Sequence, residues 1–276
     1  MEKNTIVNKN IIASLGDVRI VKMRIFSPEI ADTVKPGQFI VLMVNEKGER
    51  LPFTVVKAES ELVTIIFQEI GYSTKLLGRL DEGGRLFALV GPLGHASKIK
   101  NYGRVMLVAG GVGIAEILPI ASKMKEEGNH VCIVIGSKTK SLIILEDELR
   151  NVSDEIYIVT DDGSYGEKGF TTNIMKEKIN SNRYDLVYTV GPILMMQKAA
   201  EITKEKGIKT VACLNSLILD GTGMCGCCRV TIGGEVRFAC VDGPEFDAHL
   251  VDWKELMSRT GVYKPKEEHI CKLYKK

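Results

Sequence analysis

The segment RVMLVAGGVGIAEILPIASKMKEE, residues 104–127, contains an apolar run, a glycine turn and a helical pattern in that order. The run Arg104–Ala109 is apolar enough for a buried strand. The stretch GGVG, residues 110–113, predicts a tight turn, because glycine adopts backbone conformations that other residues avoid. Apolar residues then recur at helical spacing over Ile114–Glu127. The segment therefore predicts a strand that leads through a short turn into a helix, the repeating unit of parallel sheets.

The same alternation of strand and helix continues to residue 213. Apolar runs predict further strands at Val131–Ile135, Ile156–Thr160, Leu186–Val190 and Ile208–Cys213. Helical spacing predicts helices at Leu142–Arg150, Thr171–Lys178 and Leu194–Lys206. Because strands that alternate with helices form a doubly wound parallel sheet, residues 101–213 are predicted to form a Rossmann-like domain.

Upstream of this alternation, residues 1–100 contain short apolar runs without helical spacing. Runs rich in Val, Ile, Leu and Phe occur at Asp17–Phe26, Gln38–Val44, Leu62–Phe67 and Arg85–Val90. Turn signals such as KPG at residues 35–37 and DEGG at residues 81–84 separate them. Strands at this spacing predict a small antiparallel β-barrel.

The GGVG turn is a candidate phosphate-binding loop. It lacks the last glycine of the dinucleotide-binding fingerprint, because Glu116 stands in that place. Its glycines still allow a pyrophosphate to approach the N-terminus of the next helix, where free N–H groups and the helix dipole favour negative charge. For this motif taken alone, a plain turn between strand and helix is the alternative.

Further turns follow the other predicted strands, at the edge where open parallel sheets bind ligands. Several glycine-bearing turns on one edge favour a nucleotide site over a set of plain turns. The predicted nucleotide-binding residues are Gly110, Gly111, Gly113, Ile114, Gly136, Ser137, Asp161, Asp162, Gly163, Gly191 and Pro192.

Charged residues on this edge give mixed signals about the nucleotide. Lys138 follows the second strand, where a lysine either receives the 2′-phosphate of NADP or lies solvated in a loop. Asp161 and Asp162 add negative charge on the same edge, which disfavours an additional phosphate. These residues therefore leave both NAD(H) and NADP(H) open.

The C-terminal segment DGTGMCGCCRVTIGGEVRFACVDGPEF, residues 220–246, carries a candidate metal site. Its spacing is D-x4-C-x2-C-x11-C, which matches a plant-type [2Fe–2S] pattern whose first cysteine is replaced by aspartate. The predicted ligands are Asp220, Cys225, Cys228 and Cys240. A zinc site or unligated thiols are the alternatives. Cys227 is interpreted as a non-ligand that points away, and Cys213 as incidental.

Composition narrows the class of protein further. The chain has 276 residues and a net charge of +2, which gives no electrostatic argument for nucleic-acid binding. The first ten residues, MEKNTIVNKN, lack the apolar core of a signal peptide, and no apolar run is long and uninterrupted enough for a membrane span. Seven cysteines without an export signal predict metal binding in a reducing cytoplasm.

Three segments resemble one family of flavoproteins. KPGQF at residues 35–39, LPFT at residues 51–54 and the GGVG turn follow the order of ferredoxin-reductase-like proteins. With the cysteine segment added, nearly the whole chain resembles FAD- and NAD-binding electron-transfer subunits. This group includes the subunits of dihydroorotate dehydrogenase B and of NADH-dependent reduced ferredoxin:NADP⁺ oxidoreductase, also called sulfide dehydrogenase. Asp220 in the first ligand position resembles the latter, because the dihydroorotate branch has four cysteines there.

The resemblance implies a FAD-binding barrel over residues 1–100, an NAD-binding domain over 101–213 and a [2Fe–2S] segment with a tail over 214–276. The flavin residues that it implies are Pro52, Phe53, Thr54, Ile66, Phe67, Gln68, Ser73 and Thr74. The family's flavin motif usually has arginine where this chain has Leu51, and Arg50 stands one place early.

The resemblance also implies a function and partners. Hydride passes between nicotinamide and flavin, and single electrons pass between flavin and cluster; the cofactors carry this chemistry and no general acid or base is required. Electrons then leave for a larger flavin- and iron–sulfur-containing subunit, which connects the chain to ferredoxin indirectly. A dihydroorotate dehydrogenase B subunit is the main alternative, and a zinc-stabilised nucleotide-binding protein without turnover is another.

Overall fold

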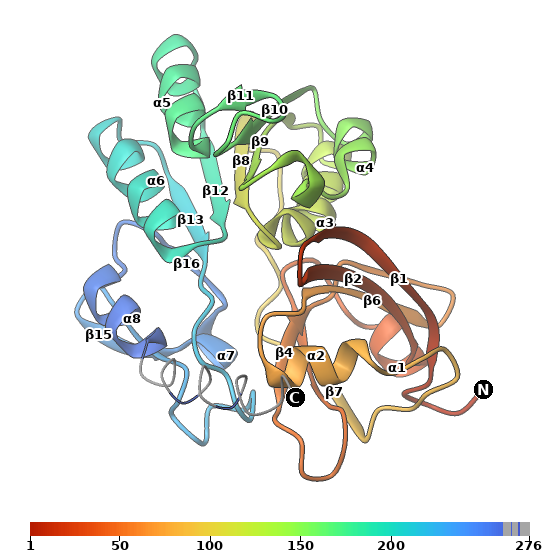
Figure 1. The fold of residues 1–276 in the computed structure, drawn as a ribbon. Helices are drawn as coiled ribbons and strands as arrows, with labels where there is room; N and C mark the ends of the chain where they lie inside the picture. The colour runs from red at the N-terminus through yellow and green to blue at the C-terminus, as the bar shows by residue number, and fades with distance from the viewer. Residues whose placement is uncertain (262–265, 267–269, 271–276) are drawn as a thin grey trace.

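The computed structural model describes residues 1–261, 266 and 270 of the chain. Figure 1 shows an α/β layer at the top, a β-barrel at the lower right and a C-terminal segment beside the barrel at the lower left. Among the described helices, none combines the length and the apolar character that a membrane span requires.

Two antiparallel sheets form the N-terminal barrel. One has the order β1-β2-β6-β5 and the other β4-β3-β7. The strands are β1 (Ile6–Leu15), β2 (Val18–Phe26), β3 (Phe39–Met43), β4 (Leu51–Thr54), β5 (Lys57–Glu59), β6 (Leu62–Gln68) and β7 (Ala88–Leu93), with helices α1 (Pro28–Ala31) and α2 (Tyr72–Gly78). Alternate residues of β2, such as Met23 and Ile25, enter a core that they share with Ile40 and Ile65. The antiparallel barrel predicted from the sequence is confirmed.

A parallel sheet of order β11-β10-β9-β8-β12-β13 forms the α/β layer. Its strands are β8 (Arg104–Gly110), β9 (His130–Ser137), β10 (Glu155–Thr160), β11 (Glu167–Lys168), β12 (Leu186–Val190) and β13 (Thr210–Cys213). Its helices are α3 (Gly113–Glu126), α4 (Glu146–Asn151), α5 (Thr171–Ser181) and α6 (Ile193–Glu205), with a 3₁₀ turn, η1 (Lys140–Leu142). The α3 and α4 side chains pack in one core and those of α5 and α6 in another, so the sheet is doubly wound, as predicted.

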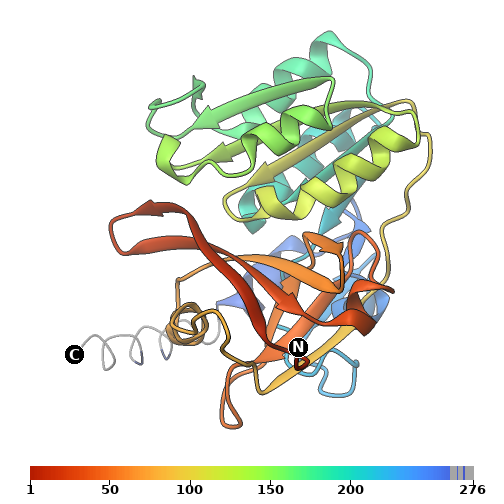
Figure 2. The ribbon, with the colours of Figure 1, turned by 90° about the vertical axis from the view of Figure 1, so that its right-hand side faces the viewer.

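The C-terminal segment folds beside both other parts, as Figure 2 shows from the side. It contains the hairpin β14 (Arg229–Ile232) and β15 (Glu235–Phe238), α7 (Ala239–Asp242), β16 (Glu245–Asp247) and α8 (Trp253–Thr260). Strand β16 pairs antiparallel with β13, so this segment extends the parallel sheet by an edge strand. The same segment packs on β3 of the barrel and therefore joins the two larger parts.

Local predictions failed where the pattern of apolar residues was broken. No strand was predicted before residue 17, yet β1 pairs with β2 along its whole length; the polar stretch NKN at residues 8–10 hides its alternation. The helix predicted at Leu142–Arg150 begins only at Glu146, because Leu145 adopts a left-handed conformation with φ of 57°. The strand predicted at Arg85–Val90 runs instead from Ala88 to Leu93.

Candidate functional site

A cavity of about 540 Å³ lies between the barrel and the carboxyl ends of the parallel strands. This volume is typical of small-molecule and cofactor sites. The barrel wall includes the predicted flavin residues Pro52, Phe53, Thr54, Ile66, Phe67, Gln68 and Thr74. The opposite wall includes the predicted nucleotide residues Gly110, Gly111, Gly113, Gly191 and Pro192. The fold thus brings the two predicted groups to one cavity, as cofactors that exchange hydride require.

The backbone geometry of a glycine brings two strand ends of this wall close to each other. Gly191 has a φ of 143°, and a Cβ atom there would lie 2.9 Å from the carbonyl oxygen of Gly110. Glycine is therefore needed for the ends of β8 and β12 to approach each other. Helix α3 begins at Gly113 on the same wall, so the positive end of its dipole lies at the cavity.

Seven predicted residues do not line this cavity. Ser73 is buried and donates a hydrogen bond to Glu49, and Ile114 is fully buried in the core. Ser137 donates to the carbonyl of Thr139 at 2.7 Å. The others are Gly136, Asp161, Asp162 and Gly163. Gly136 and Ser137 end β9, and the loop of residues 161–163 follows β10. All five of these positions are separate from the cavity wall, and their nucleotide role stays a prediction.

The cavity is also lined by polar residues for which no role was predicted, namely Glu116, Cys213, Asn215 and Thr260. Glu116 accepts a hydrogen bond from Thr54 Oγ1 at 3.0 Å and another from Cys213 Sγ at 3.8 Å. Burial raises the pKa of Glu116 to about 7, and the two hydrogen bonds oppose this shift. Cys213, which the sequence left as incidental, lines the same cavity. One feature of the sequence could have indicated a role for Glu116: this carboxylate stands where the dinucleotide-binding fingerprint has its last glycine.

The predicted cluster ligands lie in one loop region, and two of them touch. Cys228 and Cys240 are each 1% exposed, and their Sγ atoms are 3.2 Å apart. Burial, and then the hydrogen bond with Cys228, raises the pKa of Cys240 to about 12, so ligation must displace a proton from this thiol. Cys225 is exposed, three residues before Cys228.

Asp220 organises the same loop through its carboxylate. Its Oδ1 accepts the N–H of Thr222 and its Oδ2 accepts the N–H of Cys225, both at 2.8 Å. The hydrogen bond from Thr222 is the first cause of the lowered pKa of Asp220. Among the described side chains, no three of the His, Cys, Asp and Glu type are gathered closely enough to hold a metal ion. The four-ligand set therefore stays a prediction.

The donor set nevertheless fits an iron–sulfur cluster chemically. Thiolates are the ligands that such clusters use, and the buried pair Cys228 and Cys240 already lies in mutual contact. Gly221, Gly223 and Gly226 have φ values of 78°, 84° and 68°, which wrap the loop tightly around the cysteines. A loop of this kind turns backbone N–H groups inward, where they tune a cluster by hydrogen bonding.

Replacing Asp220 tests whether it ligates metal or only caps the loop. If it ligates, Asp220→Cys is expected to keep a [2Fe–2S] cluster with a shifted reduction potential, because sulfur donates more covalently than oxygen. Asp220→Ala is expected to give a fragile cluster. Redox titration monitored by electron paramagnetic resonance measures both effects. A stable cluster with unchanged potential and g-values in Asp220→Ala would leave Asp220 with the capping role alone.

One apolar cluster connects the cysteines to the cavity. Phe39 and Ile218 line the cavity. Both also pack in the apolar cluster that contains Cys228 and Cys240. A group held by these cysteines would therefore lie next to a group held in the cavity.

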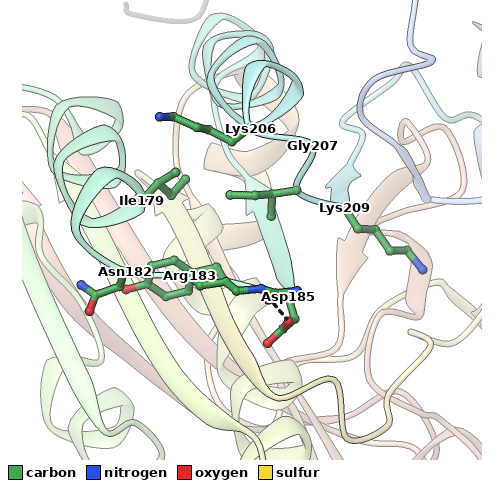
Figure 3. Close-up of a pocket in the computed structure, with 9 residues that line it drawn as sticks. Ile179, Asn182, Arg183, Asp185, Lys206, Gly207 and Lys209 are labelled. Atoms are coloured by element: carbon green, nitrogen blue, oxygen red, sulfur yellow. Dashed lines mark ion pairs between the residues drawn. The ribbon is translucent and has the colours of Figure 1, made fainter.

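A second cavity, also of about 540 Å³, lies at the other end of the parallel sheet (Figure 3). It is lined by residues before β12 and β13, including Arg183, Asp185, Lys206 and Lys209, and Arg183 and Asp185 form an ion pair at 4.0 Å. Ligands of open parallel sheets bind at the carboxyl ends of the strands, whereas this cavity faces the amino ends. Position, not size, therefore assigns the functional site to the first cavity.

Known families match the parallel-sheet domain and the cysteine segment, and known relatives match most of the chain. Residues 107–201 match the oxidoreductase NAD-binding domain, and residues 215–252 match the iron–sulfur cluster binding domain of dihydroorotate dehydrogenase B. The chain is 44% identical, over 88% of its length and 87% of the relative, to the dihydroorotate dehydrogenase B (NAD(+)) electron transfer subunit homolog of Thermotoga maritima. It is 35% identical, over 77% of its length and 79% of the relative, to the probable dihydroorotate dehydrogenase B (NAD(+)) electron transfer subunit of Methanocaldococcus jannaschii.

Solved structures give the same picture. One chain in the structure of the NADH-dependent reduced ferredoxin-NADP oxidoreductase, which was studied for flavin-based electron bifurcation, is 41% identical with a TM-score of 0.93. That match covers 100% of this chain and 99% of the other. Ferredoxin-NADP⁺ reductase from Plasmodium falciparum is 14% identical with a TM-score of 0.59, over 75% of this chain and 94% of its own, which shows a shared fold.

Proposed function

Because this chain belongs to the family of dihydroorotate dehydrogenase B electron-transfer subunits and their homologues, we propose that it is the electron-transfer subunit of an NADH-dependent ferredoxin:NADP⁺ oxidoreductase. It is an NAD(P)H-linked oxidoreductase subunit whose cofactors are FAD, a [2Fe–2S] cluster and NAD(H). In the proposed complex the electrons leave this chain for a larger subunit that carries flavin and iron–sulfur groups, and ferredoxin reacts through that subunit. Flavin-based bifurcation belongs to the same proposal.

Residues of this chain would hold each cofactor in a distinct place. FAD would lie on the barrel wall at Pro52, Phe53 and Thr54, and the nicotinamide on the glycine turns opposite. The cluster would be held by Cys225, Cys228 and Cys240 with Asp220. When bound, these groups supply hydride transfer and then single-electron transfer, whereas the protein binds, orients and shields them.

The observation that carries this proposal is that Phe39 and Ile218 border both the cavity and the cysteine site. Both side chains line the cavity and also pack beside Cys228 and Cys240. Electron transfer between a flavin and a cluster requires the two groups to be close, and this packing supports such an arrangement. A zinc site would gain nothing from lying next to a hydride-transfer cavity.

Exposed apolar side chains near the cysteine loop support docking of the larger subunit there. Met224, directly before Cys225, is 89% exposed. Leu219 and Val241 are 41% and 40% exposed. Val241 lies against the loop, because a Cβ atom on Gly223 would be 3.0 Å from its Cγ2. Exposed apolar groups of this kind mark interaction surfaces, and here they surround the point at which electrons would leave.

Flavin content and nucleotide preference test the proposal. The purified protein is expected to release about one FAD per chain on heat denaturation, because the fold offers one flavin cavity. NADH is expected to reduce this flavin faster than NADPH at equal concentration, because the relatives are named as NAD(+) subunits and the negative charge of Asp161 and Asp162 disfavours an additional phosphate. Stopped-flow absorbance measures both rates. A folded, colourless protein that cannot be reconstituted with FAD would refute the proposal, and faster reduction by NADPH would refute the preference.

The curated relatives favour a second candidate, a subunit of dihydroorotate dehydrogenase B. The match of residues 215–252 and the names of the relatives support it. Both candidates predict the same cofactors in this chain, so the partner distinguishes them. The subunit that co-purifies with the native protein is expected to contain [4Fe–4S] clusters and to bind NADP(H), whereas a dihydroorotate-oxidising partner would establish the second candidate.

A further inference from the structure

Glu116 is an ionisable group that transfer of hydride and electrons does not itself require. It lies in the first turn of α3, and among the described residues lining the cavity it is the only one with a charged side chain. Its side chain is half-buried and borders the cavity. Burial is the first cause of its raised pKa, and no cation contributes. A carboxyl group in this position has no partner charge to fix its protonation state.

The hydrogen bonds of Glu116 connect the barrel to the parallel sheet. Thr54 on β4 and Cys213 at the end of β13 both donate to the same carboxyl oxygen, Oε2. Both donors also line the cavity. Because Oε2 accepts from two groups, a proton on Glu116 is held at Oε1. The carboxyl thus has one oxygen that holds its position and another that can take up or release a proton.

A line of ionisable side chains continues from Glu116 toward the junction of the three parts of the molecule. The thiol of Cys213 interacts with the Tyr188 hydroxyl, which donates to Glu245 Oε1 at 2.9 Å. Ser97, in the connection between barrel and sheet, donates to the same oxygen of Glu245. Burial raises the pKa values of Cys213, Tyr188 and Glu245. These titratable groups lie on β12, β13 and β16, and burial favours the neutral form of each.

Resting on the function proposed above, we propose that Glu116 takes up one proton at Oε1 when negative charge enters the cavity and releases it when that charge leaves toward the cysteines. The proton at Oε1 exchanges with solvent through the cavity that Glu116 borders. The step forms or breaks one O–H bond at Glu116 and moves no electron.

Electrostatics gives the direction of this proton movement. After hydride arrives from NADH and the oxidised nucleotide leaves, the cavity carries one additional negative charge, and a nearby negative charge disfavours the ionised form of a carboxyl. With a pKa of about 7, Glu116 is largely ionised at pH 7.5 and ready to be protonated. Glu116 is not a catalytic residue in this proposal, since it balances charge and does not touch the transferred hydride.

Proton uptake during reduction tests the proposal. The flavin-loaded protein is reduced by NADH at pH 7.5 in weak buffer with a pH-indicating dye. Glu116→Gln, which cannot ionise, is expected to take up between about half a proton and one proton less per reduced flavin than the wild type, because a carboxyl with pKa near 7 is mostly ionised at that pH. Glu126→Gln, an exposed position on the same helix, is the matched control and should equal the wild type.

The outcomes separate this proposal from the proposed function. Equal proton uptake by the wild type and Glu116→Gln, both reduced by NADH, would overturn the role of Glu116 alone. A wild type that binds no flavin, or whose flavin NADH does not reduce, would overturn both. If Glu116→Gln does not fold, Cys213→Ala keeps the carboxyl and removes a hydrogen bond that lowers its pKa. This variant is therefore less ionised at pH 7.5 and is expected to take up less proton per reduced flavin than the wild type; an unchanged uptake would refute the role of Glu116.

Discussion

Replacing Cys228 or Cys240 by serine is expected to remove most of the iron from the purified protein. The two thiols touch in a buried position, so each substitution removes a donor that no neighbouring group can replace. The loss should exceed about tenfold, since even the loss of an outer hydrogen-bond partner costs about 10–100-fold in metal affinity. Cys225→Ser is expected to act in the same way. Iron and acid-labile sulfide analysis of each purified variant gives the measurement.

Cys227→Ser is the matched control for these substitutions. Its thiol points to the carbonyl of Cys225 at 3.9 Å, whereas the neighbouring Cys228 meets Cys240. The variant should therefore keep iron, sulfide and the visible spectrum of the wild type. Loss of iron in Cys227→Ser together with retention in Cys228→Ser would show that the ligand assignment is wrong. Bound zinc in place of iron in the wild type would overturn the iron–sulfur assignment.

Much of the fold could be predicted because its signals are local. The alternation of apolar runs and helical spacing after residue 104 gave the doubly wound sheet, and the GGVG turn placed a helix N-terminus at its edge. Local patterns failed at β1 (Ile6–Leu15), whose polar middle makes hydrogen bonds to residues 78–82, and at β16 (Glu245–Asp247), which joins the sheet only through contacts made by distant segments. Pairing between segments far apart in the chain leaves no periodic signal in either segment.

The candidate site, like the fold, has features that the local sequence predicts and features that only the folded structure shows. Glycine turns and the LPFT segment were recognisable one at a time, and the fold placed them around one cavity. The role of Glu116 was not predictable, because it depends on Thr54 and Cys213, which are 62 and 97 residues away in the chain. The sequence does not decide between a ligand and a loop cap at Asp220, since an aspartate in a glycine-rich turn fits both, and the structure shows the backbone hydrogen bonds of a cap.

The burial of Glu116 is expected to make the stability of the protein fall as the pH rises from about 5 to 8. Its pKa is 4.5 in the unfolded chain and about 7 in the folded protein, so between these values the folded state binds more protons than the unfolded state. The stabilisation is complete below pH 4.5 and is lost as the pH rises through 7. The shift corresponds to at most about 3 kcal/mol, and the partial exposure of Glu116 to the cavity lowers this to about 2 kcal/mol.

Glu116→Gln isolates this contribution from every other titrating group. Glutamine still accepts the hydrogen bonds of Thr54 and Cys213 but cannot ionise. Near pH 5 the two proteins should have similar free energies of unfolding, because Glu116 is protonated in the folded state. At pH 8 the variant should be more stable by about 2 kcal/mol, because the wild type then holds a carboxylate in a poorly solvated place. Glu245 has a raised pKa of the same sign, but it is present in both proteins and cancels in the difference. Urea unfolding at the two pH values measures this difference, and a variant that is less stable than the wild type at both would show that Glu116 stabilises the fold as a carboxylate.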